Sequence, residues 1–570
     1  MYDLVVRGAT LCDGTGSAAR RADVAVRDGV IVDLGAVAGP GRMEIDATDR
    51  VLSPGFVDVH THYDCQLFWD PMASPSPWHG VTTVVTGNCG FTLAPCRPEH
   101  REILMRLLCF VEGMPLETLR AGLPWTWESF AEYLDAVEAA EPGVNVAAFV
   151  GHSALRFAVM GADALERPAT DAERRALVAS MREAMDAGAL GWSTSLAPTH
   201  FFADDGKPAP SRVADRAELL ALAEGLGDRP HGVIEVAPQL IVASAEAKIE
   251  EQAFFAALAR ASGKTVSWAP LFQNEFFADA GLRCLDDAAR WQAQGVAVVP
   301  QVGCRPLELR FDFASPSFGL ENNPVWRERM AWSRDARRAF FADPEGRATL
   351  DADGSGFVAS LAPTWDRLIL RLPAGERTRR WQDRSVAEIA TALGVTPVEA
   401  FCDIVLADDL EGQWGAVLMN ADEAQLGAMI RHPASVLALS DAGAHMDTLC
   451  DQGFSTHLLG HWVRERGALS LEEAVRLLTH DPATRYGLAG RGCVRVGAAA
   501  DLVVFDATRV ACRPSEMVYD LPGGRGRLVQ GADGIEWVIV NGRAVVERGV
   551  PTGRRPGRVL REYAGATGGS

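Results

Sequence analysis

Apolar and polar residues alternate with a period of two in many short runs of this chain, which is the pattern of β-strands. In residues 51–64, VLSPGFVDVHTHYD, a proline–glycine turn precedes such a run, and His60 and His62 fall on the same face. The rise of a strand places their Cα atoms about 7 Å apart. Further apolar runs predict strands at residues 81–87, 144–150, 189–195, 233–237, 266–269, 296–299 and 436–440.

Helical patterns lie between several of these predicted strands. Thr170 and Glu173 form a capping box, an apolar stripe with helical spacing follows, and Gly188 closes the segment. Strand–helix alternation of this kind implies parallel strands joined by crossovers. Eight such units favour an α/β fold of the (β/α)8 TIM-barrel type, whose site lies at the carboxyl ends of the strands. An open doubly wound sheet is the alternative, but the chain has no GxGxxG fingerprint to support it.

The two ends of the chain are rich in short strand patterns without helices between them. Asp28-Gly29 near the start and Asn541-Gly542 near the end are hairpin signals. We expect residues 1–50 and 486–560 to build one small β-domain together, and residues 51–485 to form the barrel.

The seventh and eighth predicted strands are much farther apart in the sequence than a usual loop allows. Residues 305–432 are therefore expected to be an insertion within the barrel, and inserted regions over a barrel mouth commonly shape the substrate pocket. Residues 564–570 are expected to be a disordered tail.

Composition narrows the classes of partner. The chain has 570 residues, 48% of them hydrophobic, which suffices for one large domain and a smaller one. A net charge of −20 and a pI near 5.1 argue against nucleic acid or an anionic membrane as partners. No run approaches the ~18 apolar residues of a membrane span, and the N-terminus has no secretory pattern. Eleven cysteines without CxxC or regular spacing suggest reduced thiols and a cytoplasmic protein.

Polar residues at the predicted strand ends carry the candidate chemistry. His60 and His62 can converge on one metal ion, and two unpaired imidazoles in a core would otherwise cost free energy. Asp441 closes the eighth strand, where it could bind the metal, take a proton from metal-activated water and pass it to a leaving nitrogen. Cys89, in TGNCG after the second strand, could ligate zinc as a thiolate, or be a small buried cysteine.

The motifs PGFVDVHTHYD, TGNCG, GHSALR, GALGWSTSL and LSDAGAH occur in this order. Together they resemble the amidohydrolase superfamily and, within it, the N-acyl-D-amino-acid deacylases (D-aminoacylases). The resemblance implies a metal-dependent hydrolase on a barrel, with both chain ends joined in a β-sandwich. It also implies that Cys89 is a metal ligand and that Asp441 matches the catalytic aspartate of the eighth strand.

Further candidates follow the third and fourth strands. In GHSALR, His152 could donate a hydrogen bond to a developing oxyanion. Arg156 could hold a substrate carboxylate, although a structural role in holding a loop is favoured for it. Ser193 and Ser195 end the fourth strand and could contact substrate through their hydroxyls.

Two more candidates lie after the seventh and eighth strands. His445 is four residues past Asp441 and could line the site or orient that carboxylate. Arg305, at the start of the insertion, is a candidate for substrate binding.

The fifth and sixth strands depart from the family pattern. The family places a histidine at the end of each, whereas this chain reads HGVIEVAPQ and VSWAPLFQNE. Glu235, inside the fifth strand, is a candidate replacement ligand, because a buried carboxylate requires a cation. The fourth strand has no lysine that could be carboxylated to bridge two metals. We therefore expect a single ion on His60, His62 and Asp441, with Cys89 or Glu235, and these ligand types favour zinc.

The segment after Asp441 also departs from the pattern. D-aminoacylases carry an arginine there that grips the substrate carboxylate, whereas this chain has Asp451 and Gln452 in that region. The resemblance therefore does not extend to this clamp.

The sequence predicts a metal-dependent amidohydrolase that hydrolyses a non-peptide C–N bond, most simply in a linear N-acyl amide. One alternative is a cyclic-amide hydrolase acting on a hydantoin- or dihydropyrimidine-like ring, against which the missing strand-four lysine counts. An alternative of another class is a non-catalytic binding protein on a decayed barrel, against which His60, His62 and Asp441 count. The expected partner is a small-molecule amide, with no nucleic acid and no membrane, and a homo-oligomer stays open.

Overall fold

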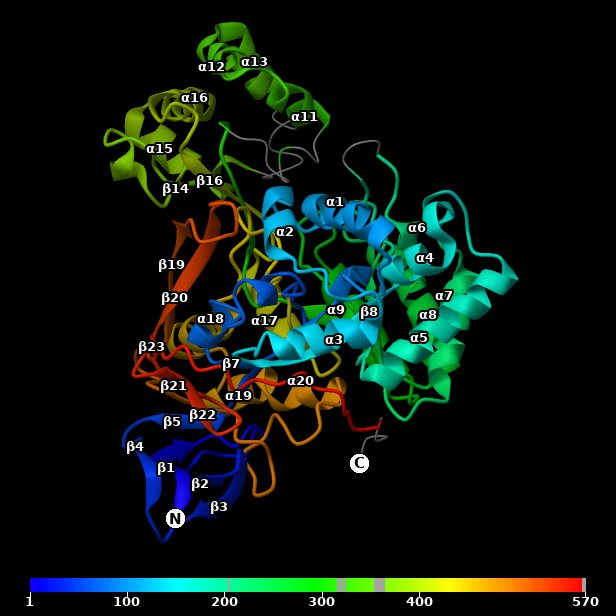
Figure 1. Ribbon diagram of the computed structural model, residues 1–570. Coiled ribbons are helices and arrows are strands. Elements are labelled where there is room, and N and C mark those ends of the chain that lie inside the picture. Colours follow the sequence, from blue (N-terminus) through cyan, green and yellow to red (C-terminus); the bar gives the residue numbers. More distant parts are fainter. Residues whose placement is uncertain (203–205, 315–319, 321–323, 353–363, 566–570) are drawn as a thin grey trace.

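The computed structural model describes residues 1–202, 206–314, 320, 324–352 and 364–565 (Figure 1). Its central element is an eight-stranded parallel sheet in which the strands follow one another in chain order. These strands are β6 (Phe56–Asp58), β7 (Val81–Thr86), β8 (Asn145–Gly151), β9 (Gly191–Ser195), β10 (Val233–Ala237), β11 (Thr265–Trp268), β12 (Val298–Val302) and β17 (Val436–Leu437). Each apolar run in the sequence overlaps one of them, so the strand predictions are confirmed.

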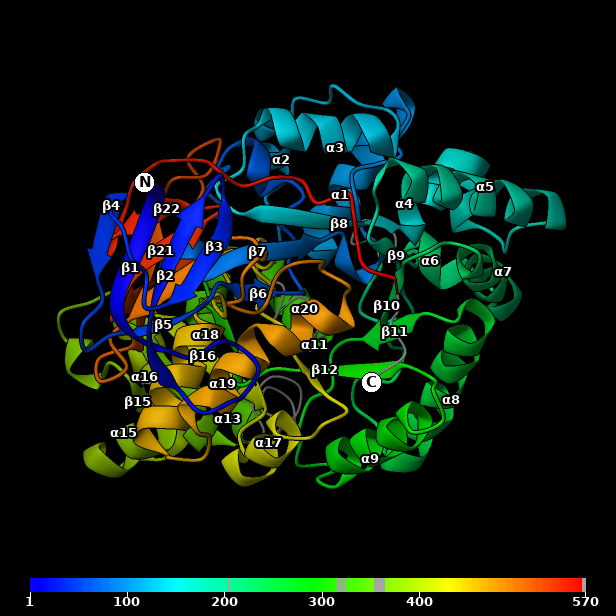
Figure 2. The same ribbon diagram turned by 90° about the horizontal axis from the view of Figure 1, so that it is seen from below.

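Helices follow most of these strands and lie on the outer side of the sheet (Figure 2). The predicted capping box at Thr170 begins one of them, and Gly188, with φ of 110°, ends it in the left-handed region that glycine tolerates. The helices are α1 (Arg101–Val111), α2 (Leu116–Gly122), α3 (Phe130–Ala139), α4 (His152–Met160), α5 (Asp171–Ala187), α6 (Pro210–Val213), α7 (Arg216–Gly227), α8 (Ala245–Ser262), α9 (Ala280–Gln292), α17 (Glu423–Ile430), α18 (Phe454–His457), α19 (Leu471–Leu478) and α20 (His480–Arg485).

The first and last strands of this sheet meet just beyond their carboxyl ends. Thr61 forms a parallel bridge with Ala442, whose carbonyl accepts a hydrogen bond of 2.7 Å from the amide of His62. Ser440 also donates its hydroxyl to Asp58 at 2.5 Å. The sheet therefore curls until its two edges touch, which is consistent with a (β/α)8 barrel.

A nine-stranded sheet combines the two ends of the chain. In Figure 1 its N-terminal strands form the blue group at one end of the molecule. The strands are β1 (Tyr2–Leu11), β2 (Arg20–Arg27), β3 (Val30–Gly35), β4 (Gly41–Asp46), β5 (Val51–Pro54), β18 (Leu502–Phe505), β21 (Ile535–Val540), β22 (Arg543–Glu547) and β23 (Val550–Pro551).

Residues 51–54, which the predicted domain boundary at residue 51 assigns to the barrel, belong to this second sheet. β5 pairs with β1 and β18, and β6 begins only after Gly55. A Cβ at Gly55 would lie 2.0 Å from the hydroxyl of Thr82, so glycine permits the close approach of β6 to β7 at this point. The proline–glycine pair therefore separates two sheets.

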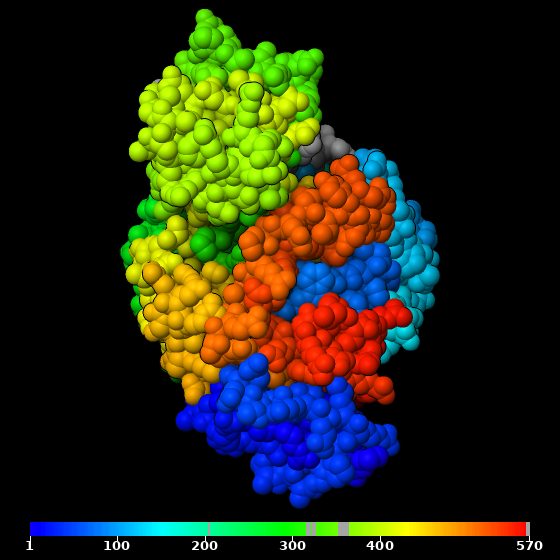
Figure 3. Space-filling view, turned by 90° about the vertical axis from the view of Figure 1, so that its left-hand side faces the viewer, coloured from blue at the N-terminus to red at the C-terminus, as the bar shows by residue number. Residues whose placement is uncertain are grey.

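The segment between β12 and β17 has a sheet and a core of its own. Phe313, Phe401 and Trp414 pack their rings together in that core. This segment stands at the opposite end of the molecule from β1–β4 (Figures 1 and 3). Its elements are β13 (Leu307–Phe311), α11 (Pro324–Met330), α12 (Arg334–Ala342), α13 (Pro344–Ala352), β14 (Leu368–Leu372), β15 (Arg384–Ser385), α15 (Val386–Leu393), α16 (Pro397–Ala407) and β16 (Gln413–Met419).

The remaining strands, β19 (Ala511–Val518) and β20 (Arg527–Asp533), form a separate two-stranded ribbon. Of the predicted disordered tail, Ala564 donates its amide to Gly487 at 2.8 Å, and residues 566–570 lie outside the described residues. In the part of the chain that the structure describes, no individual helix combines the length and apolar character needed to cross a bilayer; α15 and α16 reach them only as a pair bent by 99°.

Candidate metal centre and active site

The carboxyl ends of three barrel strands bring four of the predicted ligands together. His60 and His62 follow β6, Cys89 follows β7 and Asp441 follows β17. The ligand atoms of His60, His62 and Cys89 all lie within 4.8 Å of one another. We name these four residues, together with Glu235 of β10, the ligand cluster.

Distances inside the ligand cluster fit a tetrahedral metal. His60 Nε2 lies 3.5 Å from Cys89 Sγ and 3.4 Å from Asp441 Oδ1. His62 Nε2 lies 3.7 Å from the same Asp441 oxygen. Metal–ligand bonds of 2.0–2.3 Å in tetrahedral geometry place neighbouring ligand atoms about 3.3–3.8 Å apart. The donor set of imidazole, thiolate and carboxylate is also one that zinc accepts.

Each histidine of the ligand cluster is oriented through its second ring nitrogen. His60 Nδ1 lies 2.9 Å from Gln301 Oε1, and because that amide oxygen can only accept, His60 donates from Nδ1 and leaves the Nε2 lone pair for a metal. His62 Nδ1 faces Glu112 Oε1 at 3.5 Å. Partners of this kind fix the tautomer of metal-binding histidines.

Sequence reasoning missed both of these partners. Gln301 is a polar residue inside an apolar strand, VVPQV, which is a signal that could have identified it. Glu112 follows α1 in the chain and has no local pattern that connects it with His62, although its carboxylate is buried.

Cys89 lies in a tight loop that is fixed from two neighbouring strands. Its backbone has φ of 56°, a left-handed conformation that is uncommon outside glycine. Its amide donates to Glu235 Oε2 at 2.7 Å. Ser193 accepts a 3.0 Å hydrogen bond from Gly90 and donates its hydroxyl to the carbonyl of Gly87. Ser193 therefore supports the loop that presents Cys89, and its expected contact with substrate stays a prediction.

Glu235 faces Cys89 of the ligand cluster rather than the outer helices. One carboxylate oxygen accepts from Cys89, and the other, Oε1, is buried without a hydrogen-bond partner among the described residues. Burial raises the pKa of Glu235 to about 8. An orphaned buried carboxylate oxygen beside histidine and cysteine donors matches a further ligand for a cation.

Asp441 is held in an unusual backbone conformation beside the two histidines. Its φ is 47°, and Leu439 and His445 on either side have φ of 72° and 46°. Burial acts to raise the pKa of Asp441, but the neighbouring His62 and His60 outweigh burial and lower this pKa well below its usual range. The carboxyl group of Asp441 is therefore ionised. Its side chain remains 27% exposed, so an ionised base is accessible at the strand end.

His152 and Arg156 form a different buried group, with Glu218 of α7. His152 contacts Thr194 Oγ1 at 2.9 Å and Glu218 Oε1 at 2.8 Å, so both ring nitrogens are engaged. Arg156 donates to both oxygens of Glu218, at 2.6 and 2.5 Å, and to the carbonyl of Ala164. We name His152, Arg156, Glu218 and Thr194 the arginine cluster. These contacts favour a structural role over the predicted oxyanion and carboxylate contacts.

Two histidines near the ligand cluster come from separate loops. Ser195 Oγ lies 2.6 Å from Nδ1 of His200, a residue that sequence reasoning did not single out. Burial lowers the pKa of His200 to about 3 and that of His445 to about 4, so both rings are neutral at physiological pH. The amide of His445 donates to the carbonyl of Glu112, which ties this residue to the loop after α1.

Arg305 lines a pocket that also contains Asp441. Its Nε lies 3.2 Å from Asp451 Oδ1, and its Nη1 donates to Gln530 Oε1 at 2.8 Å. The apolar part of the wall is formed by Phe272, Leu307, Leu439 and Phe454. The structure thus places the predicted substrate-binding arginine beside the predicted catalytic aspartate.

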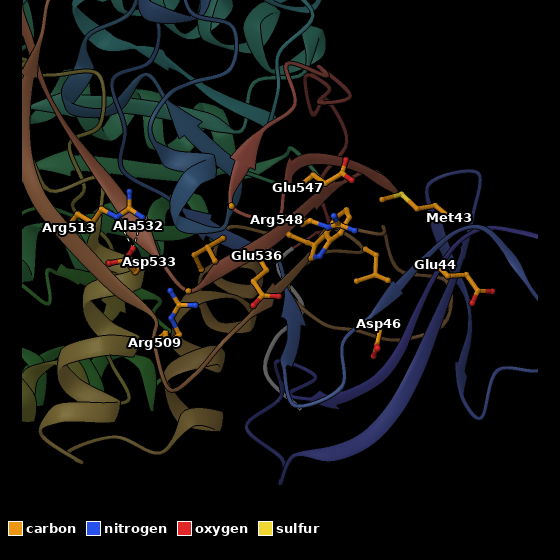
Figure 4. A pocket seen from close by; sticks show the side chains of 15 residues that line it. Met43, Glu44, Asp46, Arg509, Arg513, Ala532, Asp533, Glu536, Glu547 and Arg548 are labelled. Carbon is orange, nitrogen blue, oxygen red and sulfur yellow. Dashed lines mark hydrogen bonds and ion pairs between the residues drawn. The ribbon is translucent and has the colours of Figure 1, made fainter.

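A larger hollow, of about 780 Å³, lies elsewhere, between β4 and the strands β20–β22. Figure 4 shows its charged lining, with Glu44 and Asp46 on one side and Arg509 and Arg513 on the other. None of the residues in its lining belongs to the ligand cluster. Size alone therefore does not identify the chemical site.

Comparisons with known proteins cover nearly the whole chain. Residues 43–546 match the model of the Amidohydrolase family. N-acyl-D-glutamate deacylase of Alcaligenes xylosoxydans xylosoxydans is 30% identical over 578 aligned positions, covering 99% of this chain and 98% of the relative. D-aminoacylase of the same organism is 30% identical over 576 positions, with coverage of 99% and 98%. A crystal structure of N-acyl-D-glutamate deacylase from Bordetella bronchiseptica, complexed with zinc and a phosphonate mimic of the tetrahedral intermediate, has a TM-score of 0.67 and 28% identity, covering 98% of this chain and 100% of that one.

Proposed function

Because this chain belongs to the amidohydrolase family, we propose that it is a metal-dependent hydrolase of a non-peptide C–N bond, in a linear N-acyl amide. The observation that carries the proposal is the convergence of His60, His62 and Cys89 within 4.8 Å of one another, with Asp441 at 3.4 and 3.7 Å from the two histidines. The deacylase relatives support the same reaction class.

A divalent metal, for which we propose one zinc ion, would be held by the ligand cluster. His60, His62 and Cys89 supply nitrogen and sulfur donors, and Asp441 and Glu235 supply carboxylates. When bound, such an ion lowers the pKa of a water molecule and polarises the amide carbonyl. The histidine–thiolate character of the set favours zinc over magnesium or calcium.

Asp441 performs the proton transfers in this proposal. Its ionised carboxylate accepts a proton from the attacking water and returns it to the leaving nitrogen. Gln301 and Glu112 keep the two imidazoles in the required tautomer and orientation. His445, four residues from Asp441, is the candidate for a contact with the oxyanion.

The same proposal includes the division of the chain. Residues 1–50 and 486–560 would form the β-sandwich domain, residues 51–485 the barrel and 305–432 its insertion; the composition of the two large sheets supports this division except at residues 51–54, which pair with β1 and β18. A cytoplasmic setting is supported by the eleven cysteines, all of which are free thiols in the described structure.

The test is metal content measured beside hydrolysis. Purified protein is expected to contain about one zinc per chain and to release amine from N-acyl amides. His60→Ala is expected to lose both properties while keeping the secondary structure of the wild type. The exposed His480→Ala is the matched control and should change neither. A folded, metal-free protein that stays inactive with every added divalent metal would refute the proposal, and hydrolysis of hydantoins in preference to linear amides would favour a cyclic-amide hydrolase.

A further inference from the structure

The pocket beside Asp441 holds a positive charge that is already matched. Arg305 and Asp451 lie on its wall with Nε and Oδ1 3.2 Å apart. Their side chains are 19% and 18% exposed, so neither charge is extensively hydrated. An ion pair this far removed from water is much less screened than a surface pair.

Several elements hold Arg305 in this position. Asn420 donates its side-chain amide to the carbonyl of Arg305 at 3.1 Å, and Gln530 of β20 accepts from the guanidinium at 2.8 Å. Asp451 approaches from the segment after β17. The pair is thus a fixed part of the wall.

This pocket is small, with a free volume of about 20 Å³, and adjoins the position of the amine half of the substrate in the proposed reaction. Asp441 is the group that returns a proton to the leaving nitrogen in the proposed reaction, so the substituent on that nitrogen lies next to Asp441. Asp441 itself lines the pocket, together with the Arg305–Asp451 pair and the apolar side chains of Phe272, Leu307, Leu439 and Phe454.

We propose that Asp451 makes this pocket selective for an amine half without a free carboxylate. The substrate class is then an N-acylated amine or amino-acid amide with a neutral substituent, which distinguishes this chain from relatives whose names specify N-acyl-D-glutamate or N-acyl-D-aspartate. This inference rests on the proposed function and names the substrate class of the same site.

The reason is electrostatic. A substrate carboxylate at Arg305 would have to displace Asp451 or lie beside it, and Asp441 adds a further negative charge to the same wall. Either arrangement leaves a carboxylate in a partly buried place without its own cation, which is strongly unfavourable. A neutral amide or apolar substituent has no such cost and gains contact with the apolar wall.

The first experiment needs no variant. N-acetylleucine and N-acetylleucinamide, each as both enantiomers, differ in the charge of one group, and release of the α-amine is followed for all four. We expect kcat/KM for the better amide enantiomer to exceed that for the acid by about 100-fold, the order of discrimination with which a pocket rejects an added substrate polar group that it does not pair. An equal or higher value for the acid would overturn the inference.

The second experiment is designed to shift the substrate preference from the amide towards the acid. Asp451→Asn frees Arg305 and is expected to raise kcat/KM for the acid by about 100-fold, since the guanidinium can then pair with a substrate carboxylate. The double variant Arg305→Met with Asp451→Asn should lose this gain. Asp383→Asn, at an exposed pair with Arg371, is the matched control and should leave the ratio of acid to amide unchanged.

Binding separates the two proposals. Calorimetry with the acid and the amide is expected to show the amide bound more tightly by the wild type and the acid more tightly by Asp451→Asn. Tight binding of the amide without any hydrolysis would refute the proposed function and sustain the selectivity. Hydrolysis with no difference between acid and amide in either protein would sustain the function and refute the selectivity. Circular dichroism of each variant checks that it is folded.

Discussion

The ligand cluster and the arginine cluster are both buried groups of ionisable residues at the ends of barrel strands, and each contains histidine. In the arginine cluster every charge has an opposite partner, since Glu218 accepts from Arg156 and contacts His152. In the ligand cluster, by contrast, His60 Nε2 lies within 3.5 Å of both Cys89 Sγ and Asp441 Oδ1, and Glu235 Oε1 has no partner among the described residues. In the first arrangement the charges are matched within the protein, and only Arg156 Nε lacks a hydrogen-bond partner among the described residues, whereas the unmatched carboxylate and histidine–cysteine donors of the second require a cation.

This difference identifies function better than residue type does. A histidine after the third strand and two after the first look alike in sequence, yet only the latter direct lone pairs at a common centre. Buried charged groups are normally paired, so an unpaired buried carboxylate oxygen beside histidine and cysteine donors indicates a bound cation.

The largest expected effect falls on the ligand cluster. Asp441→Asn removes the base and acid of the proposed reaction without changing size, and kcat/KM should fall by about 10²–10⁴-fold. The measurement is amine release under saturating zinc. Asp447→Asn, on an exposed residue six positions later, should stay near the wild-type value. Full activity in Asp441→Asn would remove the distinction between the two clusters.

Substitutions in the arginine cluster should lower the stability of the folded protein without changing its catalytic rate. Glu218→Gln leaves the Arg156 charge buried without a partner, which costs about 3–5 kcal/mol of folding free energy. The expected result is a lower denaturation midpoint with kcat per folded molecule unchanged. Glu224→Gln, on the exposed face of the same helix α7, is the control. A selective loss of kcat in Glu218→Gln at native stability would assign His152 to catalysis after all.

Glu112 tests how far the ligand cluster extends. Glu112→Gln weakens the contact that orients His62 through Nδ1. Loss of a group that orients a metal ligand typically lowers metal affinity or activity by about 10–100-fold. Competition with a chromogenic chelator measures the affinity for zinc. The exposed Glu117→Gln should bind zinc as the wild type does, and equal affinity in all three proteins would exclude a role for Glu112.

The smallest effect concerns pH. Burial acts to raise the pKa of Glu218, but His152 and Arg156 outweigh it and lower the pKa to about 2, from an ordinary value of 4.5. A depressed pKa in the folded state stabilises the protein above pH 4.5, and this contribution is lost as the pH falls towards 2. The difference in denaturation midpoint between the wild type and Glu218→Gln should therefore be constant from pH 7 to 5 and should decrease as the pH falls below about 4.5. A difference that grows on acidification would contradict this sign.

Much of this arrangement could be predicted from local patterns. The barrel strands were predictable because apolar runs and helix caps are short-range signals, and His60, His62, Cys89 and Asp441 follow such runs directly. Their convergence follows from parallel strands ending at one face.

What the sequence did not predict depends on partners that are remote along the chain. The pairing of β5 with β18, the contact of Glu112 with His62 and the pair of Arg305 with Asp451 each join segments that no local pattern connects. For the same reason the motif at His152 does not reveal the partner of this residue, because Glu218 lies 66 residues away on α7.

The contact between the first and last barrel strands also bears on the order of folding. Thr61 bridges Ala442, and Asp58 and Ser440, 382 residues apart in sequence, share a hydrogen bond directly beside His60 and Asp441. A chain that leaves the ribosome from its N-terminus therefore carries His60 and His62 long before Asp441 exists. Such long-range closure is slow. The metal centre therefore forms late in folding. An ion bound there would stabilise the closed barrel and would not direct the earlier folding steps.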